Sequence, residues 1–313
     1  MKYLKIQDEI NYYKKTYEVK KAIEEIFLAK DYNEIQLSAF EDIQVKKSIY
    51  DKAKMDSMVK VVNKNSDLLT LRLDNTSGIL KKVIPKLRED ESIKLFYDSK
   101  VFRKDITSNI KEIRQLGVEC IGKGLEADKE ITCMTLEILD KFNGDFILEV
   151  SNSKYIRALI EVLDLSEKDE LKLKELLYTK NRFELRAFLD EKDIEDDLKK
   201  KLERLLDLQG SFKEVIESAR ENCVNEKMKM AVKDIEELSG YIDSLGYSKF
   251  VKYDFSMIME FSYYDGLIFK GYYPNHYKDI ICGGRYDRFT EKFGNRMPAI
   301  GFSLDIDELT EIV

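Results

Sequence analysis

The sequence has only one histidine, His276, no tryptophan, and four cysteines without a CxxC pair, at positions 120, 133, 223 and 282. Such widely spaced thiols with a single imidazole do not form the ligand patterns of zinc or iron–sulfur sites. We therefore predict reduced cysteines, no metal site and no cofactor.

Long apolar runs and an excess of positive charge are also missing. No stretch of about 18 apolar residues occurs, and the opening MKYLKIQDEI lacks the apolar core of a signal peptide. These absences predict a cytoplasmic protein that does not enter a membrane. The net charge of −7 disfavours binding to nucleic-acid phosphates, and lysines alternate with acidic residues as on a solvated helix face.

The 313 residues are enough for a large core that divides into two units, or for one domain with a substantial insert. Apolar residues recur at helical spacing over 5–30, while NEIQL, LLTLRLD, IKLFYDSKVF and EIRQLGVECIG have strand patterns. The last two predict an antiparallel hairpin with a mobile loop, RKDITSNIK, at its tip.

Helical periodicity without proline dominates residues 151–245, and strand patterns return from 250 to 272 and at the C-terminal end. Strands, then helices, then strands predict an α+β fold in which an all-helical insert interrupts an antiparallel sheet flanked by helices. The predicted divisions are 1–150 for the first part of the core, 151–245 for the insert and 246–313 for the second part.

The order of six short motifs resembles the catalytic core of class II aminoacyl-tRNA synthetases, and among these the histidyl enzyme. EIQLSAFE resembles motif 1, LRLDNTS the substrate strand, and KVFR with QLGVECIG motif 2. FSYYDGLIF and GGRYD resemble the two histidine-specific motifs, and AIGFSLDIDEL lies where motif 3 belongs. The resemblance covers about 1–150 and 250–313.

Two cations that this resemblance implies are replaced. Activation of histidine with ATP accumulates negative charge on the α-phosphate, which synthetases stabilise with arginines. Arg103 keeps the first position, but Met259 precedes the tyrosine pair and Glu308 follows motif 3. Methionine supplies no charge and glutamate inverts it. The motif 2 loop is also shortened and keeps only Gln115, so we predict no synthetase activity.

A synthetase-like core with these losses resembles the regulatory subunits of short-form ATP phosphoribosyltransferase, the first enzyme of histidine biosynthesis. The resemblance implies a catalytically silent subunit without an anticodon-binding domain. It also implies binding to a short catalytic subunit, homodimerisation through the class II core within a hetero-octamer-like assembly, histidine as effector, and no tRNA. Ser38 replaces the motif 1 proline, which leaves the dimer geometry open.

The same resemblance implies a histidine pocket. Asp74, Thr76 and Gln115 lie where the synthetase holds the amino group, while Glu119 and Tyr264 lie where it reads the imidazole. The remaining wall would consist of Tyr263, Gly283, Gly284, Arg285 and Tyr286, with Arg103 or Arg285 as the partner of the carboxylate.

Structural roles remain open for these residues. Asp74 is also suited to cap the helix that follows it, and Glu119, within an apolar strand, needs either a ligand or Arg285 as partner. The tyrosine pair has alternating strand faces, so one ring could lie in the core and only the other in the site. Gly283 and Gly284 also suit a turn.

Two other functions compete with the regulatory one: a stand-alone histidine sensor, and a degenerate histidyl-tRNA synthetase-like protein that still adenylates histidine or binds tRNA. Feedback could also act at a site shared with the catalytic subunit.

Overall fold

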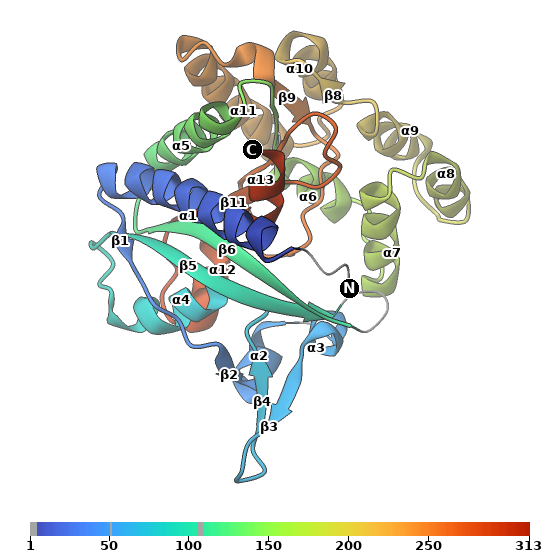
Figure 1. The fold of residues 1–313 in the computed structure, drawn as a ribbon. Helices are drawn as coiled ribbons and strands as arrows, with labels where there is room; N and C mark the ends of the chain where they lie inside the picture. The colour runs from blue at the N-terminus through green and yellow to red at the C-terminus, as the bar shows by residue number, and fades with distance from the viewer. Residues whose placement is uncertain (1–4, 51, 105–108) are drawn as a thin grey trace. The chain divides into compact units, whose positions relative to one another are not determined.

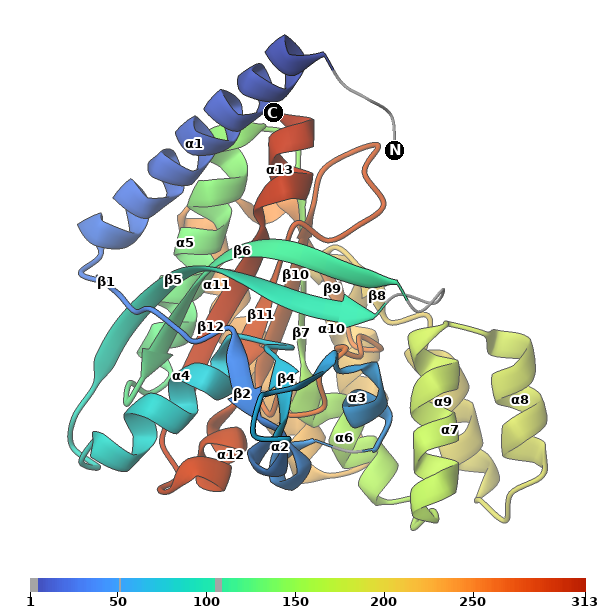
Figure 2. The same ribbon diagram turned by 60° about the horizontal axis from the view of Figure 1, so that its bottom comes forward.

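The computed structural model describes residues 5–50, 52–104 and 109–313 (Figures 1 and 2). The chain divides into two compact units. The first comprises Met1–Ala127, Lys141–Asn143 and Asp287–Val313, and the second comprises Asp128–Asp140 and Gly144–Tyr286. Each unit combines a sheet of mainly antiparallel strands with helices, which confirms the predicted α+β class. None of the described helices has both the length and the apolar composition needed to cross a bilayer.

The first unit has a main sheet in the order β1-β5-β6-β12 and a small sheet in the order β2-β4-β3. In the main sheet β1 is parallel to β5 and the other pairs are antiparallel. The strands are β1 Asn33–Glu34, β2 Phe40–Asp42, β3 Lys60–Val62, β4 Leu68–Leu71, β5 Ile93–Lys104, β6 Ile110–Ile121 and β12 Ala299–Asp305. The helices are α1 Ile6–Ala29, α2 Ile43–Ile49, α3 Lys52–Ser57, α4 Thr76–Val83, α12 Asp287–Thr290 and α13 Ile306–Ile312.

The two faces of the main sheet in the first unit differ in polarity. On one face, Phe27 of α1 packs against Phe96 and Phe302, with ring centroids 5.6 Å and 6.0 Å away. Side chains alternate along a strand. The next row of paired residues therefore points to the opposite face, and this row is Leu95↔Glu119↔Gly301. The apolar face is thus covered by α1, and the other face is left for polar side chains.

The sheet of the second unit has the order β11-β10-β7-β9-β8, in which β7 and β9 are parallel. The strands are β7 Ile147–Asn152, β8 Gln209–Gly210, β9 Val251–Asp254, β10 Leu267–Tyr272 and β11 Ile281–Arg285. The helices are α5 Glu126–Phe142, α6 Ser153–Glu161, α7 Glu167–Tyr178, α8 Arg182–Asp190, α9 Asp196–Leu205, α10 Phe212–Glu221 and α11 Glu226–Ser244. Figure 2 shows α7, α8 and α9 grouped together within this unit.

Several predicted elements are confirmed. Helix α1 occupies the predicted 5–30 segment, and the hairpin of β5 and β6 pairs from Ile93↔Ile121 to Lys104↔Ile110. Part of its predicted loop, residues 105–108, lies outside the described residues. The predicted insert, 151–245, contains α6 to α11, although the short β8 interrupts the helices. The divisions at 150 and 245 stay predictions.

The predicted strand signal over 250–272 was wrong in its middle. Strand β9 ends at Asp254 and β10 begins at Leu267, so the tyrosine pair lies in the connection between them. Asp254 begins this connection with a turn, since its Oδ1 accepts hydrogen bonds from the backbone N–H of Ser256 at 2.8 Å and from its hydroxyl at 2.6 Å.

A half-buried carboxyl on β7 predicts a pH-dependent stability difference. Burial is the main cause that raises the pKa of Glu149, and the nearby Asp254 adds to it. Because its pKa is raised on folding, Glu149 favours the folded state at low pH and loses this contribution as pH rises above its unfolded value of about 4.3. Glu149→Gln should therefore match the wild type near pH 4 and become more stable than it toward neutral pH.

Urea unfolding midpoints measured at several pH values would test this expectation. Glu191→Gln, at an exposed position, is the control and should follow the wild-type profile. Parallel profiles for Glu149→Gln and the wild type would contradict the assignment.

Candidate ligand-binding site

The segment between β4 and α4 carries the first predicted site residue, Asp74. Its Oδ1 accepts the backbone N–H of Ser77 at 2.7 Å, and its Oδ2 accepts the Ser77 hydroxyl at 2.9 Å and the Tyr50 hydroxyl. Asp74 thereby satisfies a donor in the first turn of α4 that has no partner within the helix. The sequence left two roles open for Asp74, and the structure shows the contacts expected for capping α4. The second role, binding the amino group of histidine, stays a prediction.

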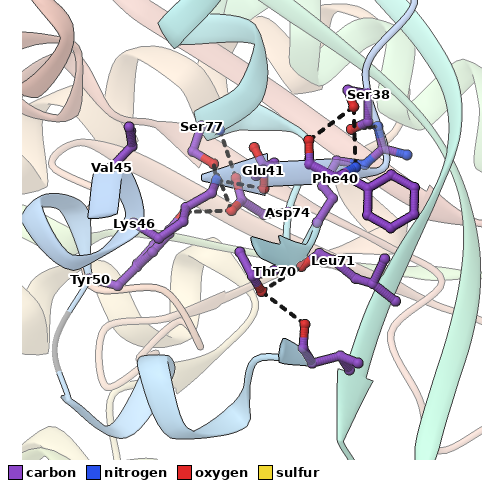
Figure 3. Close-up of polar contacts among 12 residues, drawn as sticks. Ser38, Phe40, Glu41, Val45, Lys46, Tyr50, Thr70, Leu71, Asp74 and Ser77 are labelled. Atoms are coloured by element: carbon purple, nitrogen blue, oxygen red, sulfur yellow. Dashed lines mark hydrogen bonds and ion pairs between the residues drawn. The ribbon is translucent and has the colours of Figure 1, made fainter. Parts of the chain in front are cut away.

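Lysine 46 extends this network from α2, as Figure 3 shows. Its Nζ lies 2.8 Å from Glu41 Oε2 and donates to the Ser77 hydroxyl at 2.5 Å, although only 2% of Lys46 is exposed. Burial raises the pKa of Glu41, and the attraction of Lys46 opposes this shift. The buried cation thus holds α2, β2 and the start of α4 together. The sequence analysis missed Lys46 because nothing in the local pattern distinguishes it from its neighbour Lys47.

The start of α4 also contacts the polar face of the main sheet. Thr76 donates its hydroxyl to Glu119 Oε1 at 2.6 Å, and Asn75 Nδ2 donates to Gln115 Oε1 at 3.1 Å. The hydroxyl of Ser99 donates to Asn75 Oδ1 at 2.6 Å. Four predicted residues, Asp74, Thr76, Gln115 and Glu119, therefore gather around the start of α4. Asn75 and Ser99 belong to the same group and were missed, although the hairpin places Ser99 directly opposite Gln115.

Glu119 is buried, with 2% of its surface exposed, and a glycine on the next strand makes room for it. A Cβ at Gly301, which pairs with Glu119 in the register, would lie 2.0 Å from Glu119 Oε2. On β6, a Cβ at Gly117 would lie 2.3 Å from the hydroxyl of Tyr97. The glycines in AIGF and QLGV therefore provide space for polar side chains on this face.

Among the predicted pocket residues of the first unit, Arg103 lies apart from the others. It pairs with Lys111, four residues along the hairpin from the Ser99↔Gln115 pair. At about 3.3 Å per residue, this places it about 13 Å along the strands. A role for Arg103 in binding the histidine carboxylate stays a prediction.

The two positions without the expected arginine have ordinary structural surroundings. Glu308 lies in the first turn of α13, where its backbone N–H donates to Asp305 Oδ1 at 3.1 Å. Negative charge is favourable at a helix N-terminus. Met259 is half-buried in the connection between β9 and β10. Neither residue can supply a cation.

In the second unit, the predicted tyrosines form an aromatic cluster. The Tyr263 ring centroid lies 4.8 Å from that of Tyr264 and 5.9 Å from that of Tyr286, which meets it edge to face. Phe261 stacks on Tyr263 at 5.3 Å. Because the pair lies in a connection, the expectation that strand alternation separates the two rings was wrong.

Arg285 is buried and has a partner that the sequence analysis missed. Its Nε and Nη2 donate to Asp128 Oδ1 of α5 at 2.9 Å and 2.6 Å, and 3% of its side chain is exposed. Gly283 and Gly284 lie within β11 and not in a turn. At Gly284, φ is +157° and a Cβ would lie 2.4 Å from the Leu267 carbonyl oxygen, so glycine permits the close approach of β10.

Comparisons with known proteins agree with this arrangement. A family model described as histidyl-tRNA synthetase matches residues 11–309. The ATP phosphoribosyltransferase regulatory subunit of Bacillus cereus (strain AH187) is 31% identical over 300 residues, which cover 94% of this chain and 71% of that protein. This chain belongs to the family of ATP phosphoribosyltransferase regulatory subunits.

Solved structures support the fold of this regulatory-subunit family. A Bacillus halodurans protein described as an ATP phosphoribosyltransferase regulatory subunit/histidyl-tRNA synthetase superimposes with a TM-score of 0.86 and 29% identity, over 96% of this chain and 79% of that one. A chain from the ATP phosphoribosyl transferase complex of Thermotoga maritima has the same fold, with a TM-score of 0.72 and 19% identity over 93% of this chain and 97% of that one.

Proposed function

We propose that this chain is the non-catalytic regulatory subunit of a short-form ATP phosphoribosyltransferase. In that role it binds separate short catalytic chains and pairs with itself through the class II core in a larger hetero-oligomer. The complex transfers the phosphoribosyl group from phosphoribosyl pyrophosphate to ATP, the first step of histidine biosynthesis. The regulatory subunit is needed for this activity and transmits feedback inhibition by histidine.

The observation that carries the proposal is that two expected cations are lost while a set of polar ligand residues is retained. The carboxylate of Glu119 and the side chains of Thr76 and Gln115 lie together at the start of α4. Met259 and Glu308, in contrast, cannot stabilise the negative charge that builds up when a carboxylate attacks an α-phosphate. Residues suited to an amino acid are kept while two of the three arginines suited to ATP chemistry are replaced, which fits a sensor and not a ligase.

Histidine would bind through complementary hydrogen-bonding groups. Its ring and ammonium present N–H donors, and the carboxyl oxygens of Glu119 are suited to accept them. Regulation then requires that histidine binds the active and inactive states of the complex unequally, by about 1–3 kcal/mol. Within the first unit, we assign the contact with histidine to Glu119 and the neighbouring Thr76.

Catalytic silence has a direct test. Histidine-dependent exchange of labelled pyrophosphate into ATP is the first half of a synthetase reaction, and we expect no exchange above a protein-free control. A histidyl-tRNA synthetase assayed in parallel shows that the conditions support the reaction. Exchange that depends on this chain and on histidine would contradict the assignment and favour a ligase.

Assembly is tested by light scattering after size-exclusion chromatography. This chain, a short catalytic subunit, and their mixture are run separately. We expect the mixture to give a particle heavier than either component. If the two proteins elute at their separate masses at concentrations of about 10 μM, a stand-alone histidine sensor becomes the better description, since weaker binding than this corresponds to less than about 7 kcal/mol.

A further inference from the structure

Residues from the 151–245 segment contact the connection that carries the tyrosine pair at both of its ends. We call residues 255–266 the tyrosine loop. At its start, the backbone N–H of Phe255 donates to the Leu208 carbonyl at 3.0 Å, just before β8. At its end, the Gly266 carbonyl accepts the backbone N–H of Ser153 at 2.8 Å and its hydroxyl at 3.1 Å.

Helix α6 makes two further contacts to this loop. The ring of Tyr155 packs against Phe255 with centroids 4.7 Å apart. The Nη2 of Arg157 donates to the backbone carbonyl of Tyr264. The guanidinium therefore fixes the orientation of the peptide that follows the tyrosine pair, and a charged donor makes such a bond stronger than a neutral one.

The same helix is bound to the rest of the helical segment. The Tyr155 hydroxyl donates to the Ala219 carbonyl of α10 at 2.8 Å, and Asn225 Nδ2, at the start of α11, donates to the Ala158 carbonyl at 3.0 Å. Asn152, which caps α6, donates to Asp234 of α11 at 3.0 Å. A displacement of α10 or α11 therefore moves α6 and, with it, both ends of the tyrosine loop.

We propose that Arg157 is a positioning residue that couples the helical segment to the tyrosine loop, and through it to recognition of histidine. For the ligand, this inference rests on the proposed function and on the predicted contact of Tyr263 and Tyr264 with histidine. For the coupling, it rests on contacts within the second unit alone. It gives the helical segment a role: a partner chain that shifts α10 or α11 changes the placement of Tyr263 and Tyr264 without touching them.

The test compares the full chain with Arg157→Ala and a matched control. Arg186→Ala removes an arginine of the same helical segment whose guanidinium pairs with Glu203 of α9 at 2.6 Å, away from the loop. By hydrogen exchange and mass spectrometry, Arg157→Ala should raise the exchange rates of peptides covering 255–266 at least about tenfold, with β5 and β6 unchanged. Arg186→Ala should leave those peptides unchanged. Loop exchange unaffected by Arg157→Ala would overturn the proposal.

Calorimetric titration with histidine supplies the second measurement. The dissociation constant should rise about tenfold in Arg157→Ala, recover partly in Arg157→Lys, and stay constant in Arg186→Ala. If the wild type binds no histidine, the proposed role in sensing histidine is wrong. The hydrogen-exchange result still tests whether Arg157 couples the helical segment to the tyrosine loop. If Arg157→Ala does not fold, Arg157→Gln is measured instead. The proposal would be overturned if Arg157→Gln had the same exchange rates over 255–266 and the same dissociation constant for histidine as the wild type.

Discussion

Replacing Lys46 with methionine should destabilise the first unit by roughly 3–5 kcal/mol, the typical cost of removing one partner from a buried charge pair. Lys46 is 2% exposed and lies between Glu41 and Ser77, whose hydroxyl contacts Asp74. Methionine fills a similar volume but leaves the Glu41 carboxylate without its cation. The start of α4 should loosen first, because Ser77 loses the donor that orients it.

Urea unfolding followed by circular dichroism measures this effect, and the chain contains its own control. Lys47, the next residue on α2, is exposed. Lys47→Met should change the unfolding midpoint little, since surface substitutions usually change stability by less than about 0.5 kcal/mol. A double variant, Lys46→Met with Glu41→Gln, should recover part of the loss. Equal midpoints for the Lys46 and Lys47 variants would show that the buried cation does not stabilise the unit.

The second large effect concerns ligand binding. Glu119→Gln should raise the dissociation constant for histidine about 10- to 100-fold, because a hydrogen bond to a charged group contributes about 1.5–3 kcal/mol. Glutamine keeps the shape and an oxygen that accepts the Thr76 hydroxyl, so the folded state should persist. Titration calorimetry on the wild type and the variant measures the difference, and thermal unfolding verifies that both are folded.

A glutamate on the same strand provides the control. Glu112 is exposed on β6 and pairs with Lys100 at 2.6 Å. Glu112→Gln should bind histidine like the wild type. If Glu119→Gln retains wild-type affinity, histidine does not use the polar face of the first unit, and a site shared with the catalytic subunit becomes the better hypothesis.

The sequence predicted those features that depend on local pattern. The spacing of Val19, Ile23 and Ile26 predicted α1, and alternation along 93–102 and 112–122 predicted the hairpin of β5 and β6. The motif order also placed Thr76, Gln115 and Glu119 together, and the contacts at the start of α4 confirm their proximity.

Features that depend on tertiary packing could not be predicted in this way. Lys46 is buried between Glu41 of β2 and Ser77 of α4, and Ser77 lies 31 residues away along the chain. Asp128 becomes the partner of Arg285 only when α5 packs on β11. The tyrosine loop was predicted to be a strand because its aromatic residues favour strands. In the structure the Asp254 turn ends β9 before the loop, and Arg157 of α6 binds the Tyr264 carbonyl within it.

If this chain regulates a catalytic partner, it changes the rate of that partner's reaction. Phosphoribosyl-ATP formation by a short catalytic subunit is followed alone, with this chain, and with this chain plus histidine. We predict that the chain raises the rate at least about tenfold, equivalent to about 1.4 kcal/mol of barrier, and that histidine reverses the increase. A rate unchanged by adding the chain would contradict the regulatory role.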